Sequence, residues 1–220
     1  MASKTIVLVS GGMDSCVCAA LAARAGQPAF LHFSYGQRTA ARERRAFEAI
    51  ADLYQIRDRL VVETDFFRQI GGSALTDETI AVPMVAADAA IGAEIPVTYV
   101  PFRNAHFLAA AVSWAEVLGA NEIVIGAVEQ DSSGYPDCRA AYYDVFNRLL
   151  QVGTRSGELA VATPLIRLTK TQIVRLGLEL QAPFHLSWSC YQNSEKACRE
   201  CESCRLRLRA FAQAGVEDPL

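Results

Sequence analysis

Short apolar runs alternate with amphipathic stretches along most of this chain. Residues 6–9 form a continuous apolar run rich in β-branched side chains, which is typical of a strand buried on both faces of a parallel sheet. Residues 39–56 instead place apolar side chains at helical spacing, with charges between them. Because such strands and helices alternate with short connections, the pattern predicts a Rossmann-like α/β fold with a parallel five-stranded sheet and helices on both faces. The predicted strands are residues 6–9, 29–35, 58–64, 121–128 and 159–163, and the predicted helices are residues 15–25, 39–56, 105–118, 140–153, 170–181 and 204–214.

Two regions depart from this alternation. Residues 65–99 contain several glycines and prolines but no sustained period, as expected of an active-site lid or of an insert that makes a subunit contact in a homodimer. From Pro183 onward the pattern is irregular and rich in cysteine. We therefore expect an α/β domain over residues 1–182, which contains the insert or lid, followed by a C-terminal lobe over residues 183–220.

The composition fits one good-sized core. The chain has 220 residues, of which 51% are hydrophobic, and it contains no run of about eighteen apolar residues that would predict a membrane span. Its first residues lead directly into a strand pattern rather than a secretory signal, so we expect a cytoplasmic protein with no membrane partner. The net charge of −3 argues against a general electrostatic grip on nucleic acid, because phosphate binding usually requires a basic surplus.

The seven cysteines are unevenly distributed, and four of them follow the pattern Cys-x7-Cys-x2-Cys-x2-Cys. Because cytosolic cysteines stay reduced, a metal site is expected rather than a disulfide scaffold. Four thiolates match a tetrahedral structural Zn²⁺ site, and an iron–sulfur cluster is the alternative, although no redox signal accompanies it. The predicted metal ligands are Cys190, Cys198, Cys201 and Cys204, whereas Cys16, Cys18 and Cys138 are interpreted as core or turn residues.

The sequence Ser-Gly-Gly-Met-Asp-Ser lies between the first strand and the first helix. This position in an α/β sheet binds anions, because the helix N-terminus offers unpaired N–H groups and a partial positive charge. Gly11 and Gly12 let the backbone approach an anion closely, and Ser10 and Ser15 add hydroxyl donors. Asp14 fits beside phosphates only if a cation is shared, so we assign it to Mg²⁺. A tight strand-to-helix turn without a ligand is the simpler alternative.

The glycine turn matches neither of two familiar phosphate motifs. The dinucleotide fingerprint G-x-G-x-x-G is absent, and no lysine follows the glycines as in a Walker motif. The turn instead resembles the pyrophosphate-binding loop of the ATP pyrophosphatases, a group that includes GMP, NAD and asparagine synthetases. These enzymes split ATP between its α and β phosphates and transfer AMP to a substrate oxygen. The resemblance implies an ATP site formed by Val9, Ser10, Gly11, Gly12, Met13, Asp14, Ser15 and Cys16.

Three further features occur with the glycine turn: Val-Pro-Phe-Arg-Asn at 100–104, Ser-Gly-Tyr-Pro-Asp-Cys-Arg at 133–139, and the cysteine cluster. Together they resemble the 7-cyano-7-deazaguanine synthases, which make the nitrile precursor of queuosine. The resemblance implies conversion of 7-carboxy-7-deazaguanine and ammonia to the nitrile at the cost of two ATP. It further implies that the carboxylate is adenylated, that ammonia gives the amide, and that the amide oxygen is adenylated and lost.

Candidate substrate residues lie at the carboxyl ends of the predicted strands. Arg103 lies between a strand end and a helix, where such sheets bind ligands, and we assign it to a phosphate or to the substrate carboxylate. Asn104 is expected to be the N-cap of the following helix. A guanine-like edge offers paired N–H donors that a loop carboxylate can accept, and a tyrosine can stack on the base. The predicted substrate-binding residues are Asp131, Tyr135, Asp137 and Arg139.

The resemblance implies two more cations beside the phosphates. Lys170, at the start of a predicted helix, would neutralise phosphate charge during AMP transfer, and Arg207 would reach the phosphates from the lobe. With Asp14 and Arg103 they complete the predicted catalytic set. A solvated lysine and an ordinary basic helix are the simpler explanations of these two side chains.

One position departs from the family pattern. The family loop usually has the sequence Pro-Gly-Arg-Asn, and this chain has phenylalanine at position 102 in place of the glycine. Because phenylalanine adopts a positive φ only at a cost, we expect either a loop without that conformation or a reshaped pocket. Two other functions stay open: an adenylating ATP pyrophosphatase that amidates or thiolates a different acceptor, and a zinc-ribbon module that binds nucleic acid.

Overall fold

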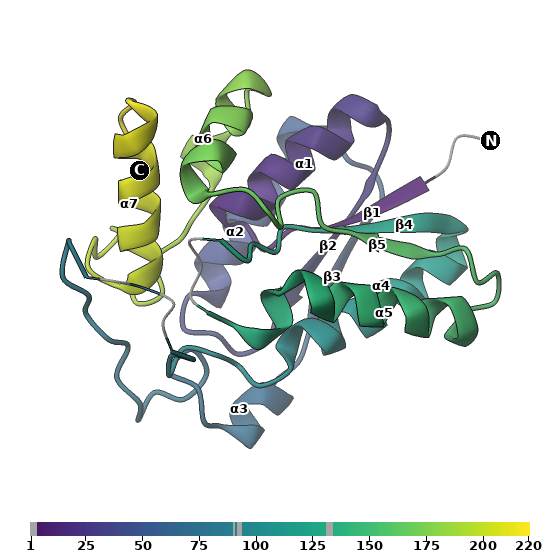
Figure 1. Cartoon of the computed structure of the whole chain (residues 1–220), viewed down its shortest axis with the longest axis horizontal. Coiled ribbons are helices and arrows are strands. Elements are labelled where there is room, and N and C mark those ends of the chain that lie inside the picture. The colour runs from purple at the N-terminus through teal and green to yellow at the C-terminus, as the bar shows by residue number, and fades with distance from the viewer. Residues whose placement is uncertain (1–3, 90, 92–93, 131–133) are drawn as a thin grey trace.

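A parallel sheet forms the centre of the structure (Figure 1). The computed structural model describes residues 4–89, 91, 94–130 and 134–220. In these residues the sheet has five strands in the order β3-β2-β1-β4-β5, and all neighbouring strands are parallel. The strands are β1 (Lys4–Leu8), β2 (Ala29–Ser34), β3 (Arg59–Glu63), β4 (Ala120–Ile125) and β5 (Ala160–Ala162). The predicted α/β fold with a five-stranded parallel sheet is confirmed.

The order of the strands changes direction at β1, since β2 and β3 lie on one side of it and β4 and β5 on the other. Residue Ile6 pairs in register with Ala29 of β2 on one side and with Ile123 of β4 on the other. In a sheet of this kind, the connections that leave β1 and β4 run to opposite faces, and a crevice opens between them. A ligand site is therefore expected beyond the carboxyl ends of these two strands.

Helices cover both faces of the sheet (Figure 1). The side chains of β1 alternate between the two layers: Val7 packs in a core with α1, α2 and α6, whereas Ile6 and Leu8 pack in a core with α4 and α5. The helices are α1 (Met13–Ala25), α2 (Ala40–Leu53), α3 (Phe66–Ile70), α4 (Arg103–Leu118), α5 (Ala140–Gly153), α6 (Lys170–Glu179) and α7 (Glu202–Ala214), with 3₁₀ turns at Pro136–Cys138 and Phe184–Leu186.

The longer helices agree with the predicted ranges to within a few residues, and α3 was not predicted. A helix of five residues is too short to show a hydrophobic period, so the sequence pattern of the insert conceals it. The fourth strand ends at Ile125 rather than at residue 128, because the chain leaves the sheet there to border the crevice. In the described ranges, the structure has no helix with the length and hydropathy of a membrane span.

The C-terminal lobe packs against both the sheet domain and the insert. Phe211 of α7 belongs to the same core as α1 and α6, and α7 lies beside α6 (Figure 1). Cys201 forms an antiparallel bridge with Met84 of the insert, and the Val85 N–H donates to the carbonyl of Glu200 (2.8 Å). The insert and the lobe are therefore joined by backbone hydrogen bonds near the cysteine cluster.

Candidate active site

A cavity of about 270 Å³ lies at the switch point of the sheet. Its walls come from the turn after β1, the ends of β2 and β4, the first residues of α4 and α6, and the C-terminal lobe. The fold thus brings together segments that are far apart in the sequence. The predicted site residues that line this cavity are Val9, Ser10, Gly12, Met13, Asp14, Ser15, Arg103, Tyr135, Lys170 and Arg207.

The glycine turn is packed too tightly for any other residue at position 11. Gly11 has φ +88°, and a Cβ atom there would lie 2.6 Å from the carbonyl oxygen of Glu43. On its other side, the Gly11 carbonyl accepts a hydrogen bond of 2.8 Å from the backbone N–H of Trp188. The turn is therefore held between α2 and the C-terminal lobe, and the start of α1 faces the cavity.

The hydroxyls of the turn bind one another and the backbone. Ser15 donates to the Gly12 carbonyl (3.0 Å), and its Oγ lies 3.1 Å from that of Ser10. Gly12 N–H donates to Ser10 Oγ (3.2 Å). Cys16, by contrast, points into the core, and its burial raises the pKa of the thiol to about 12. The structure thus places the serines at the cavity and Cys16 behind it.

Asp14 and Lys170 form an ion pair in the cavity lining. Lys170 Nζ donates to Asp14 Oδ2 at 2.5 Å, while Asp14 Oδ1 is buried and has no hydrogen-bond partner. Lys170 is held in place by the helix it begins, since Thr169 and Gln172 form a capping box there. A buried carboxylate oxygen without a donor suits a bound cation, and the neighbouring ammonium suits an anion.

Arg103 projects from the start of α4 into the cavity. Its Nη1 donates to the Tyr35 hydroxyl (3.0 Å), and its guanidinium carbon lies 5.5 Å from the centre of the Tyr35 ring and 5.6 Å from that of Phe107. Nε of Arg103 is buried without a hydrogen-bond partner. Burial raises the pKa of Tyr35 to about 12, so this hydroxyl stays neutral. Because the Tyr35 hydroxyl is neutral, it does not offset the positive charge of Arg103. The Nε of Arg103 is a free donor for an anion.

The loop after β4 is anchored to α4, and one prediction about it was wrong. Asn104 lies inside α4 rather than at its N-cap, which is Phe102. The Asn104 N–H donates to Asp137 Oδ2, and its Nδ2 donates to the Asp137 carbonyl, both at 3.0 Å. The helix start thus obtains its acceptor from a distant loop instead of its own sequence. Burial raises the pKa of Asp137, and its Oδ1 has no partner.

The predicted substrate-binding residues of this loop that the structure describes lie at different distances from the cavity. Tyr135 lines the cavity, and its hydroxyl donates to Thr98 Oγ1 (3.0 Å). Arg139 precedes α5 and is not among the residues that line the cavity in the described part of the chain. Asp137 is buried behind the cavity wall, and Asp131 lies outside the described residues. Of the four predicted substrate-binding residues, the structure thus brings Tyr135 to the cavity.

Phe102 adopts the backbone conformation that a glycine would favour. Its φ of +57° and ψ of +24° are left-handed, its side chain is 59% exposed, and its N–H donates to the Tyr99 hydroxyl (2.9 Å). The ring makes edge contacts with His106 and Tyr142. The expectation of a loop without this conformation was wrong, because the loop keeps it. Phe102 is not among the described residues that line the cavity, and a reshaped pocket stays a prediction.

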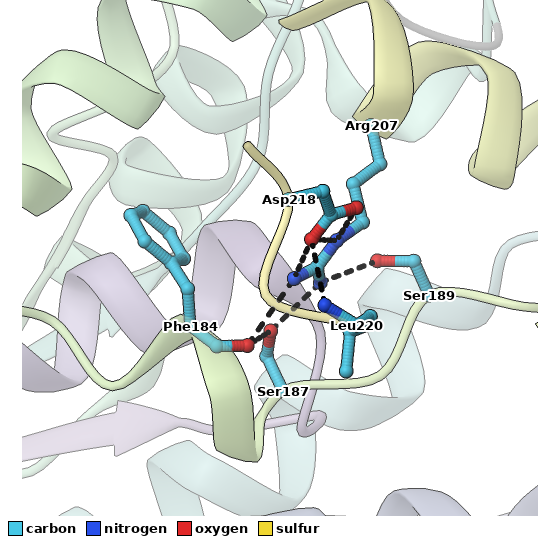
Figure 2. Close-up of polar contacts among 6 residues, drawn as sticks. All are labelled: Phe184, Ser187, Ser189, Arg207, Asp218 and Leu220. Carbon is cyan, nitrogen blue, oxygen red and sulfur yellow. Dashed lines mark hydrogen bonds and ion pairs between the residues drawn. The ribbon is translucent and has the colours of Figure 1, made fainter. Parts of the chain in front are cut away.

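Arg207 is held by a network in the C-terminal lobe (Figure 2). Its Nε and Nη2 donate to the carboxylate of Asp218 at 2.9 Å, and Nη1 donates to the hydroxyl of Ser187 at 2.7 Å. Nη2 also donates to the Phe184 carbonyl (3.2 Å), and Nη1 to Ser189 Oγ (3.4 Å). Arg207 lines the cavity, yet each of its donors already has a partner.

The four predicted metal ligands converge. The Sγ atoms of Cys190, Cys198, Cys201 and Cys204 all lie within 4.8 Å of one another. Backbone N–H groups of Asn193 and Cys198 donate to Cys190 Sγ at 3.3 and 3.4 Å, which favours the thiolate form. With metal–sulfur bonds of about 2.3 Å, such a set suits a tetrahedral ion with no open position.

Several residues that line the cavity were not predicted from the sequence. Tyr35 and Gln37 follow β2, and Gly126 follows β4, so the rule that ligands bind beyond the carboxyl ends of the strands would have found them. A Cβ atom on Gly126 would lie 3.1 Å from the backbone of Asp14, so a side chain at this position would crowd the start of α1. Trp188 and Tyr191 carry no such signal, because only the folded lobe brings them to the cavity.

The strand order, the glycine turn at the switch point and the pair of Asp14 and Lys170 define an α/β protein with a cavity suited to phosphates. The family model described as "Queuosine biosynthesis protein QueC" matches residues 4–215, and the chain belongs to this family.

Curated relatives match nearly the whole chain. The protein named "7-cyano-7-deazaguanine synthase" from Acidobacterium capsulatum is 65% identical, over 99% of this chain and 95% of that protein. Proteins of the same name from Koribacter versatilis and Chlorobaculum tepidum are 62% and 56% identical, over 99% of this chain and 92% and 95% of their own lengths. Among solved structures, the fold is similar to that of NMN synthetase from Francisella tularensis, with a TM-score of 0.48 and 12% identity over 96% of this chain and 84% of that one.

The left-handed backbone at Phe102 predicts an unusual order of stability. We expect Phe102→Gly to be more stable than Phe102→Ala by about 1 kcal/mol in the free energy of unfolding, because both lose the ring contacts and only glycine relieves the strain. Urea denaturation measures the difference. Val145 is exposed in the ordinary helix α5 and serves as the control. There the order should reverse, with Val145→Ala more stable than Val145→Gly. Equal stability of the two variants at position 102 would contradict the strain argument.

Proposed function

We propose that this chain converts 7-carboxy-7-deazaguanine and ammonia to 7-cyano-7-deazaguanine with two ATP. The relatives of that name, 65% and 62% identical over 99% of this chain, carry the proposal. The cavity at the switch point supports it, because its glycine turn, acidic side chain and basic side chains suit a nucleotide and a carboxylate.

Adenylation accounts for the chemistry at each step. The substrate carboxylate attacks the α phosphate of ATP, pyrophosphate leaves, and the bound carboxylate becomes an acyl-adenylate. Ammonia displaces AMP with loss of a proton and forms the amide. The amide oxygen then attacks the α phosphate of the second ATP, and pyrophosphate and one nitrogen proton are lost. Departure of AMP with that oxygen, together with loss of the second nitrogen proton, leaves the nitrile. Each adenylation turns an oxygen that is a poor leaving group into part of a good one.

The glycine turn and the start of α1 would hold pyrophosphate. Backbone N–H groups at a helix N-terminus stabilise the charge that moves to pyrophosphate as it leaves. Mg²⁺, when bound with ATP, supplies neutralisation of phosphate charge. Asp14 would hold that ion through its unpartnered Oδ1, and Lys170 would shift from Asp14 to a phosphate oxygen.

The substrate would lie on the Arg103 side of the cavity. The unpartnered Nε of Arg103 offers a donor to the substrate carboxylate or to a phosphate, and the ring of Tyr135 offers a surface for the flat heterocycle. We assign recognition of the base edge to Asp131 or Asp137, and the unpartnered Oδ1 of Asp137 supports the second of these. Arg207 would exchange its long bond to Ser189 for a phosphate oxygen.

The insert and the lobe would keep water from the reactive intermediates. The Arg38 side chain donates to the carbonyls of Ala74, Asp77 and Ile80, so the insert is fastened to the loop that follows β2. Exposed apolar side chains on the insert, including Ile70 and Met84, support a subunit contact in a homodimer. We place this homodimer in the cytoplasm, without a nucleic-acid or membrane partner, and treat residues 1–182 and 183–220 as its sheet domain and lobe.

Analysis of the products tests the function. Purified protein with 7-carboxy-7-deazaguanine, ammonium and Mg·ATP should give the nitrile and two AMP for each substrate consumed, as measured by mass spectrometry and nucleotide chromatography. Omission of ammonium should leave AMP formation at or below one per substrate. Amide that accumulates without nitrile would mean that the chain catalyses half of the reaction. ATP cleavage without consumption of the deazapurine would favour a different acceptor.

The unpartnered oxygen of Asp14 predicts a loss of catalysis without a loss of fold. Asp14→Asn should reduce pyrophosphate release by about 100-fold or more at saturating Mg²⁺, because it removes the charge that holds the cation. Its circular dichroism spectrum should stay unchanged. Glu179→Gln makes the same charge change at an exposed position on α6 and should keep full activity. Normal turnover by the Asp14 variant would refute this role.

We also propose that the four cysteines bind Zn²⁺. Elemental analysis should find about one zinc per chain, with tetrahedral sulfur ligation in the X-ray absorption spectrum. Cys198→Ser should lower the metal content and the midpoint of thermal unfolding, because metal binding is coupled to folding of the lobe. Cys138→Ser, outside the cluster, should keep the metal. Iron with labile sulfide, or protein without metal, would contradict zinc.

A further inference from the structure

The ion pair between Arg207 and Asp218 is buried beside the cavity (Figure 2). The side chain of Arg207 is 3% exposed, and that of Asp218 is 8% exposed. Both oxygens of Asp218 accept from Nε of Arg207, at 3.0 and 2.9 Å, and Oδ1 accepts from Nη2 at 2.9 Å. This two-pronged contact determines the plane of the guanidinium as well as its position.

The orientation of Arg207 determines its contacts with residues 187–189, a segment that contributes to one wall of the cavity. With Nε and Nη2 bound to Asp218, Nη1 points at Ser187 and Ser189, which lie on either side of Trp188. Ser187 is fully buried, and its hydroxyl donates in turn to the Phe184 carbonyl (2.7 Å). Arg207 therefore binds the serine hydroxyls at both ends of the short segment 187–189.

This segment touches the glycine turn directly. The N–H of Trp188 donates to the Gly11 carbonyl at 2.8 Å, and a Cβ atom on Gly12 would lie 3.7 Å from the carbonyl oxygen of Trp188. A continuous series of contacts thus joins Asp218, through Arg207 and the segment 187–189, to the turn after β1. A shift of the guanidinium would change both the wall and the turn.

We propose that Asp218 is a positioning residue of the nucleotide site. It holds Nη1 of Arg207 against Ser187 and Ser189 and thereby keeps Trp188 against the glycine turn, so that the turn is preorganised for the phosphates of ATP. The inference rests on the proposed function, since it takes ATP as the occupant of this cavity. The alternative role is competition: if the Asp218 carboxylate merely competed with phosphate for Arg207, its removal would strengthen ATP binding instead of weakening it.

The test compares Asp218→Asn with a charge-matched control. Glu217→Gln removes the same charge at the preceding, exposed position of the tail. Calorimetry with α,β-methylene-ATP and Mg²⁺ measures the dissociation constant, and steady-state assays of pyrophosphate release separate KM for ATP from kcat. We expect Asp218→Asn to raise both the dissociation constant and KM for ATP by about tenfold or more, with KM for ammonium unchanged. Glu217→Gln should match the wild-type protein, and Asp218→Glu should recover part of the lost affinity.

A merely structural contribution would have a different signature. It would lower the fraction of folded protein and leave the affinity of the remainder unchanged, so unchanged or tighter ATP binding by folded Asp218→Asn would overturn the proposal. If that variant does not fold, Ser187→Ala provides the same test, because it removes one contact of Arg207 and leaves the ion pair in place; a normal KM for ATP would then overturn the proposal. Wild-type protein that fails to bind the ATP analogue would overturn the proposed function together with this inference.

Discussion

The hydrogen bond from the Trp188 N–H to the Gly11 carbonyl (2.8 Å) is the contact on which the cavity depends. It joins the turn after the first strand to a lobe that begins more than 170 residues later in the chain. From the other side, the Glu43 carbonyl approaches Gly11 so closely that no side chain fits. The turn is therefore clamped, and the N–H groups at the start of α1 are preorganised for an anion instead of being free to rearrange around it.

Three of the basic side chains at the cavity, Lys170, Arg207 and Arg103, have different hydrogen-bond partners, and this difference separates their chemistry. Lys170 is paired with Asp14, which retains an unpartnered oxygen, so the two suit a shared phosphate and cation. The donors of Arg207 are occupied by Asp218, Ser187 and Ser189, so an anion would have to displace one of these partners. Arg103 donates to a neutral tyrosine hydroxyl and keeps Nε free, which makes it the side chain most available to an anionic substrate. Charge alone would not have distinguished them.

Sequence reasoning succeeded where a local rule decides the structure. Buried parallel strands, amphipathic helices and a glycine turn each have a short-range signature, and the sheet and the convergence of the four cysteines were predicted from these. It failed at the start of α4, where Asn104 looked like a cap. The acceptor for that helix comes from Asp137, 33 residues later, and a residue-by-residue rule has no access to such a partner. It failed again at Phe102, whose left-handed backbone is maintained by its surroundings, including the Tyr99 hydroxyl, against its own preference.

The sequence by itself determined the class of fold, the place of the glycine turn and the cluster of four cysteines, because each depends on residue types at close spacing. Only the tertiary structure decided which charged groups are paired and which are available. Arg103, Lys170 and Arg207 are all basic residues near helix starts or in a basic helix, and their sequence contexts do not separate them. Their roles follow from partners that lie 68, 156 and 11 positions away. Pairing over such separations is determined by how the helices pack on the sheet, and packing is a property of the whole chain.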